Sequence, residues 1–299
     1  MKKKFFDTVL SAVLAAVMLS SLAACGGGGG ETTPVGDETV FDTQQETTSQ
    51  QTTQSNEVVA TIEETVMWDN EDIKVTALNL TSNQYYHILN LRIENKTGRD
   101  LYVMASRTAV NSFVVEPIMG ADVPANSTVE DEFKIWLKDV DAKVIADIET
   151  RFSYSSSDRY LNRTTERVKL ETSAAASHDY SYDESGTVLY DADGLKIICQ
   201  GFNDEGNPMI YLSSTGELSE GCCVEAYKVY VNGKETYASY CEWVFTNTRN
   251  VAELELDDED RDGNELGEVE SLEVSFKINK ENMADRSPVR TELVEIPVK

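Results

Sequence analysis

Apolar and polar residues alternate with a period of two in many short segments beyond the first fifth of the chain. Ile73, Val75 and Ala77 alternate with Lys74 and Thr76, and similar patterns run over 133–138 and 252–256. This period, with one polar face, is typical of half-buried antiparallel β-strands. Because no segment carries a long apolar stripe at helical spacing, we predict an all-β chain.

A turn signal supports the strand pattern. Asn232-Gly233 lies between two short alternating segments, 229–231 and 234–237. Asn-Gly supplies the two positive-φ residues that a type I′ turn requires, so the sequence predicts a β-hairpin here. Each half of the folded chain holds about seven or eight such strands, which predicts immunoglobulin-like β-sandwiches, with a Greek-key barrel as the alternative.

The second half of the chain repeats the first at an offset of about 122 residues. Three blocks match in the same order: 65–75 with 187–197, Val110-Asn111 with Val231-Asn232, and 145–154 with 269–278. Loop insertions explain the small changes in offset between the blocks. We therefore expect two tandem sandwich domains, 64–173 and 186–299, joined by an interdomain linker, 174–185.

The first 24 residues have the pattern of an export signal. Lys2, Lys3 and Lys4 precede an apolar stretch, 9–24, that is too short and too early for a permanent membrane span. Leu22-Ala23-Ala24-Cys25 follows, and it resembles the lipobox of bacterial lipoproteins. The resemblance implies cleavage of the signal peptide 1–24 and lipidation of Cys25; an ordinary secretory peptide with an incidental cysteine is the alternative.

Residues 25–63 form a polar segment without any Lys or Arg. Five glycines follow Cys25, and the rest is rich in Thr, Gln, Ser and Glu with no sustained apolar period. Such a segment cannot bury enough apolar surface to fold, so we expect a disordered stalk. The predicted location is the extracytoplasmic face of the cell membrane, where the chain is held by its N-terminal lipid.

Both repeats share a pattern of core and turn residues. It consists of Thr-Val-x-x-Asp, an apolar-Lys-apolar strand, a central Asn turn and an apolar-x-x-apolar-Glu-x-x-Phe strand. This pattern resembles tandem immunoglobulin-like lipoprotein domains of Gram-positive gut bacteria. The resemblance implies a cell-surface binding or interaction role and carries over no catalytic residue. The sequence names neither the ligand nor the envelope type.

The chain is strongly acidic, with a formal net charge of −27. The first repeat carries 13 basic and 18 acidic residues, and the second carries 10 and 24, so the second repeat holds most of the negative charge. Such a surface disfavours nucleic acid and anionic membranes as partners. It favours cations or basic protein patches, although solubility outside the cell also explains it.

No recognisable catalytic motif occurs. The chain has only two histidines, His87 and His178, and neither lies in a nucleophile motif. Zinc-protease, phosphate-loop and dinucleotide-binding motifs are also missing from the sequence. We therefore predict a protein that is not an enzyme and has no catalytic residues.

Four cysteines, all in the second repeat, are candidates for disulfides in an exported protein: Cys199, Cys222, Cys223 and Cys241. Adjacent strand residues point to opposite faces. We therefore expect at most one of Cys222 and Cys223 to face Cys199 or Cys241 inside the sandwich. Buried or free thiols are the alternative, and a metal site is less favoured because no Cys-x-x-Cys spacing or nearby His supports it.

An acidic segment, 258–265, offers a candidate metal site. Asp258, Asp260 and Asp262 stand at positions 1, 3 and 5 of a calcium loop, with Gly263 at position 6. Position 12 is Val269 rather than Glu, so a solvated acidic turn is the alternative. Calcium is the one cofactor that the sequence offers, and it defines the alternative function, a calcium-dependent structural or adhesion module.

Aromatic residues of the first repeat offer a candidate binding surface. Trp136 falls on the outward face between Lys134 and Lys138, and Tyr85 and Tyr86 belong to the same repeat. A sugar or peptide platform is one interpretation, and packing under the lysine stems or against a neighbouring domain is the other. The predicted function is therefore a non-enzymatic binding or interaction module for an unknown protein or glycan ligand.

Overall fold

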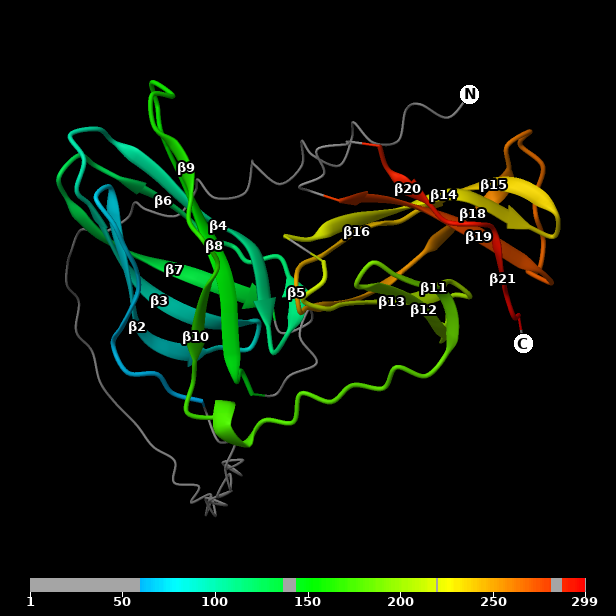
Figure 1. Cartoon of the computed structure of the whole chain (residues 1–299), viewed down its shortest axis with the longest axis horizontal. Helices are drawn as coiled ribbons and strands as arrows, with labels where there is room; N and C mark the ends of the chain where they lie inside the picture. The colour runs from blue at the N-terminus through cyan, green and yellow to red at the C-terminus, as the bar shows by residue number, and fades with distance from the viewer. Residues whose placement is uncertain (1–59, 137–143, 219, 281–286, 299) are drawn as a thin grey trace, which may run out of the picture. The chain divides into compact units, whose positions relative to one another are not determined.

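The computed structural model describes residues 60–136, 144–218, 220–280 and 287–298 (Figure 1). The predicted signal peptide, Cys25 and nearly all of the predicted stalk lie outside these residues. Residues 56–299 cluster as one compact unit. In the described part, no helix is long and apolar enough to cross a membrane.

Two sheets built from residues 65–171 make up the first half of the fold. One sheet has the order β1-β2-β3-β7. In the other, β4 pairs with β5, β6 and β8, and β8 also pairs with β9 and β10. Their bounds are β1 (Thr65–Asp69), β2 (Ile73–Ser82), β3 (Tyr86–Asn95), β4 (Leu101–Val110), β5 (Phe113–Val115), β6 (Gly120–Val123), β7 (Thr128–Trp136), β8 (Asp147–Ser156), β9 (Asn162–Thr164) and β10 (Val168–Glu171).

The second half repeats this arrangement. The order β11-β12-β13-β17 corresponds to β1-β2-β3-β7, and β14 pairs with β15, β16 and β19 as β4 pairs with β5, β6 and β8. The bounds are β11 (Thr187–Ala192), β12 (Leu195–Phe202), β13 (Pro208–Ser214), β14 (Cys222–Val231), β15 (Lys234–Ser239), β16 (Cys241–Val244), β17 (Arg249–Glu253), β18 (Glu255–Asp260), β19 (Leu272–Lys280), β20 (Val289–Arg290) and β21 (Val294–Ile296).

Within each half, the pairing is antiparallel, and strands far apart in the sequence lie side by side as in an immunoglobulin-like sandwich. The prediction of an all-β, immunoglobulin-like class is confirmed. One 3-10 turn, Ala175–Ser177, lies within the predicted linker. A parallel bridge between Phe113 of β5 and Arg249 of β17 joins one sheet of each half. The division into two separate domains with the predicted boundaries stays a prediction.

Each half has its own hydrophobic core. Phe133 and Phe152 are fully buried in the first, and Phe276 is almost fully buried in the second. Burial alternates along β3 as the period-two pattern requires, with His87, Leu89, Leu91 and Ile93 inward. Two cores of this kind explain why the apolar positions of the sequence repeat in matched blocks.

The Asn turns occupy equivalent places in the two halves. Asn232 and Gly233 have φ values of 52° and 77°, so the hairpin between β14 and β15 is confirmed. In the first half, Asn111 and Ser112 have φ values of 50° and 71° between β4 and β5. Both turns thus use the same left-handed backbone, although only the second has the favourable glycine.

The side chains of these asparagines anchor the segment that leads into the next long strand. The Asn111 Oδ1 accepts hydrogen bonds from two backbone N–H groups, and the Asn232 Oδ1 does the same. The donors are Ala146 and Asp147 in the first half, and Glu270 and Ser271 in the second. One carboxamide in each half therefore positions the segment that enters β8 or β19.

Candidate functional site

An open cleft of about 1000 Å³ lies at one end of the second half. Its walls come from the loop between β12 and β13, the first residues of β18, the segment 266–269 and the C-terminal segment 297–298. Seven half-buried apolar side chains line it: Phe202, Met209, Val251, Leu256, Leu266, Val269 and Val298. The cleft therefore has an apolar floor that remains partly accessible to solvent.

Acidic residues surround this apolar floor. Glu205, Asp257, Asp258 and Glu268 line the cleft and are exposed. Among the described residues, the lining includes no Lys or Arg. The negative charge that the composition placed in the second repeat is thus partly concentrated around an apolar surface.

Asparagine hydrogen bonds fix both walls of the cleft. The Asn203 Oδ1 accepts from the backbone N–H of Glu205 at 3.0 Å and of Asn207 at 2.9 Å, which closes the loop between β12 and β13. Asn207 in turn accepts from the Leu256 backbone N–H at 3.1 Å through its Oδ1. On the other wall, the Asn232 Nδ2 donates to the Glu268 carbonyl at 2.8 Å. These bonds preorganise the cleft without any ligand.

The acidic segment 258–265 is held by its own hydrogen bonds. Asp258 and Asp260 belong to β18. The single strand that the alternation over 252–256 predicted is divided, because β17 ends at Glu253 and β18 begins at Glu255. The Asp260 carboxylate accepts from the backbone N–H of Asn264 at 2.9 Å and of Asp262 at 3.0 Å, and it pairs with Lys234 at 3.4 Å. The backbone N–H of Asn264 contributes most to lowering the pKa of Asp260 to about 2.

The three candidate calcium ligands do not converge in this conformation. In the part of the chain that the structure describes, the oxygens of Asp258, Asp260 and Asp262 do not all lie within 4.8 Å of one another. Asp258 instead lines the cleft, and Asp260 faces Asn264 and Lys234. Calcium binding stays a prediction, and it requires Asp260 to exchange these partners for the cation.

The predicted aromatic surface comes together on the first half. Tyr86 of β3 pairs in register with Trp136 of β7, and their ring centroids are 4.7 Å apart. The ring centroid of Tyr85 lies 6.4 Å from that of Tyr86, and Tyr85 is 55% exposed to solvent. The three rings therefore form one cluster at the end of a hairpin, and ligand binding there stays a prediction.

The two histidines take part in local contacts. The His87 Nδ1 lies 2.7 Å from the Oγ of Ser82, its pairing partner across β2 and β3. The His178 ring packs edge-on against Tyr180 at 4.5 Å between centroids. Neither histidine lines the cleft.

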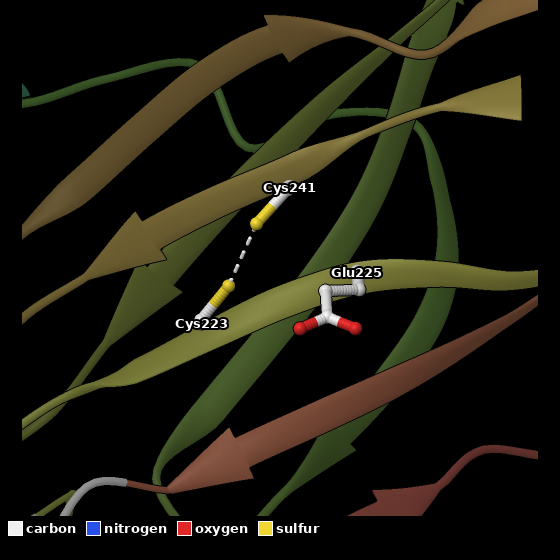
Figure 2. Close-up of side chains that lie close together, drawn as sticks. All are labelled: Cys223, Glu225 and Cys241. Carbon is white, nitrogen blue, oxygen red and sulfur yellow. Dashed lines mark hydrogen bonds between the residues drawn. The ribbon is translucent and has the colours of Figure 1, made fainter.

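The four candidate disulfide cysteines occupy different environments, and all are free thiols. Cys199 and Cys222 belong to the core, where burial raises the pKa of Cys222 to about 12. Cys223 points to the other face of β14, and its Sγ lies 3.1 Å from that of Cys241 on β16 (Figure 2). The sequence predicts that at most one of Cys222 and Cys223 faces Cys199 or Cys241, and that it does so inside the sandwich. This prediction is wrong for Cys241, because its contact with Cys223 lies on the outer face of the sheet.

Sequence reasoning missed the cleft. Phe202, Leu266 and Val269 lie at the end of a strand or in irregular segments, where apolar residues show no period. The available signal was the pair of Asn-containing loops at 203–207 and 232–233, because Asn side chains commonly fix turns. Only the fold shows that the loop 203–207 and the segment 266–269, which Asn232 holds, line the same cleft.

No protein-family model and no curated protein sequence matches the chain. Several chains of solved structures match it, and two of these matches have low similarity in both sequence and structure. The YadV chaperone is 12% identical over 70% of this chain and 92% of that one, with a TM-score of 0.24. The complex of the Salmonella enterica SafA pilin with the SafB chaperone is 11% identical over 77% and 98%, with a TM-score of 0.23. Similarity at this level carries no conclusion about function.

Proposed function

We propose that this chain is a lipid-anchored extracytoplasmic protein whose second sandwich binds a basic, partly apolar polypeptide segment in the cleft. The observation that carries this proposal is the apolar floor of the cleft within a rim of four exposed carboxylates. The leader and lipobox support the location. The fixed loops support a binding role, because a preformed cleft loses little entropy when a ligand enters.

The chemistry of the ligand follows from the lining. Apolar side chains such as Met209 and Leu256 gain from burying the apolar surface of a partner. The carboxylates of Glu205, Asp257 and Glu268 favour Lys or Arg side chains beside it. A neutral glycan satisfies only part of this surface, and an anionic ligand is repelled.

The composition of the cleft also supports a non-enzymatic role. Its described lining contains neither histidine, no cysteine and no Ser or Thr hydroxyl. A hydrolase of the Ser-His or Cys-His type needs a nucleophile and a base within hydrogen-bond reach. A binding module needs only the shape and the charge.

The experiment is a peptide array probed with the mature chain, followed by titration of the selected peptides. We expect peptides that combine Lys or Arg with apolar residues to be selected. Replacing Glu205, Asp257 and Glu268 together with Lys is expected to weaken binding at least about tenfold, because attraction becomes repulsion. Charge reversal at Glu71, Asp122 and Glu292, which are exposed acids outside the cleft lining, is the matched control. Equal loss in the two triple variants contradicts the proposal.

A calcium-dependent module is the second candidate, favoured by the loop at 258–265 beside the cleft. Asp258 both lines the cleft and is a predicted ligand, so a bound cation would change the charge of the rim. This candidate predicts that millimolar Ca²⁺ raises the melting temperature and that Asp260→Ala abolishes the rise. An unchanged melting temperature in the parent chain contradicts it.

A further inference from the structure

Two thiols on neighbouring strands of the second half meet at close range. The Sγ atoms of Cys223 and Cys241 are 3.1 Å apart (Figure 2). In the register of β14 and β16, Cys223 lies opposite Trp243 and Cys241 lies opposite Glu225. The cysteines are therefore diagonal neighbours on one face, a position from which side chains can reach each other across a sheet.

Their exposure differs. Cys223 is 4% exposed, whereas Cys241 is exposed to solvent. Burial, and then the contact with Cys241, raises the pKa of the Cys223 thiol. Cys241 is thus the thiol that a reagent in solution meets first, and Cys223 lies directly behind it.

The carboxylate beside the two sulfurs is already engaged. The Glu225 Oε2 accepts from the Nζ of Lys277 at 2.8 Å, and its Oε1 accepts from the Nδ2 of Asn279 at 2.7 Å. Cys223, Glu225 and Cys241 are close enough together to hold a metal ion. A metal would have to displace Lys277 and Asn279 from the carboxylate, whereas a bond between the sulfurs leaves both contacts intact.

We propose that Cys223 and Cys241 are a disulfide site, closed by exchange with a low-molecular-weight disulfide outside the cell. The Cys241 thiolate attacks one sulfur of the reagent and releases the first thiolate. Cys223 then loses its proton and attacks the Cys241 sulfur, which releases the second thiolate. The two cysteines lose two electrons and two protons, and the reagent disulfide becomes two thiols. The sulfurs must approach by about 1 Å to reach bonding distance.

The bond would tie a strand that contacts both sheets of the second half. β16 pairs with β14 in one sheet, and the Nδ2 of Asn250, on β17 of the other sheet, donates to the Trp243 carbonyl at 3.0 Å and to Glu242 at 2.8 Å. A disulfide between Cys223 and Cys241 closes a loop through β15 and restricts the unfolded chain. This inference does not depend on which ligand fills the cleft.

The test is non-reducing peptide mapping of the full chain in detergent after incubation with oxidised glutathione. Trypsin places Cys223 in the peptide 197–228 and Cys241 in the peptide 235–249, so a linked pair of these peptides is the expected product. Because 197–228 also contains Cys199 and Cys222, variants identify the partner. Cys199→Ala and Cys222→Ala are expected to keep the link, and Cys223→Ala and Cys241→Ala to lose it.

Thermal unfolding gives a second measurement. The oxidised parent chain is expected to melt roughly 5–10 °C above its reduced form, while the exposed-site variant Cys241→Ala melts at one temperature in both conditions. Three outcomes overturn the proposal: no linked peptide after oxidation, a link that survives Cys223→Ala, or a metal ion bound by the two thiols in the purified chain.

Discussion

One asparagine in each half, Asn111 or Asn232, fixes the turn that follows the equivalent strands β4 and β14. Asn111-Ser112 and Asn232-Gly233 have the same left-handed backbone, and each Asn holds the segment that enters β8 or β19. The backbone hydrogen bonds of Asn explain why this residue recurs at the turn while its neighbour changes. The sequence alone predicted the turn at 232–233, but the role of the Asn carboxamides needed the fold.

Gly233→Ala is expected to lower the free energy of unfolding by about 1–2 kcal/mol, because a left-handed backbone strains any residue with a Cβ. A Cβ at Gly233 would meet nothing within 4 Å, so the effect isolates backbone strain. Gly98→Ala is the matched control, since a Cβ there also meets nothing within 4 Å and its φ is not in the left-handed range. Denaturant unfolding of both variants measures the difference, and equal stabilities would show that the turn is not strained.

Lowering the pH is expected to destabilise the segment 258–265, because the Asp260 carboxylate becomes protonated. The hydrogen bonds from Asn264 and Asp262 lower the pKa of Asp260 to about 2 in the folded chain. A lowered folded pKa stabilises the fold at pH values above about 4, and this contribution is lost as the pH falls toward 2. The melting temperature of the parent chain should therefore approach that of Asp260→Asn between about pH 4 and 2. A constant difference across this range would contradict the assigned pKa.

At the scale of strands and loops, the regular elements and the aromatic cluster were predictable from the sequence, whereas the cleft was not. The alternation around Ile73 and Phe133 predicted half-buried strands, because one face of each strand packs on the core and the other faces solvent. The cleft depends on loops from distant segments, which no local period encodes. Likewise, face alternation separated Cys222 from Cys223, but only the register of β14 and β16 shows that Cys223 meets Cys241 on the outer face.

The aromatic cluster of the first half and the cleft of the second half are the two candidate binding surfaces. The aromatic cluster of Tyr85, Tyr86 and Trp136 is partly covered by its own ring contacts. The cleft combines an apolar floor with four exposed carboxylates, a pattern that favours a basic, partly apolar partner. For this reason we propose that recognition occurs in the second half, and ligand binding by the aromatic cluster stays a prediction.

For the whole molecule, our proposal is that an N-terminal lipid on Cys25 decides where the cleft works. Cys25→Ser is expected to abolish acylation, so that the protein either leaves the membrane fraction or accumulates as uncleaved precursor, because the acyl chains on Cys25 are the proposed anchor. Cys199→Ala keeps the leader intact and is the control. Fractionation with mass spectrometry of the N-terminal peptide checks both variants. An unmodified residue 25 on a membrane-bound parent chain would refute lipid anchoring.

In the function that we propose, the cleft of the second half receives a basic, partly apolar polypeptide segment. Methyl NMR of the mature chain during titration with an array-selected peptide tests it most directly. We expect saturable shifts at Met209, Leu256 and Val269, with the methyl groups of the first half unchanged. Shifts confined to residues around Tyr85, Tyr86 and Trp136 would place recognition on the first half and contradict the account.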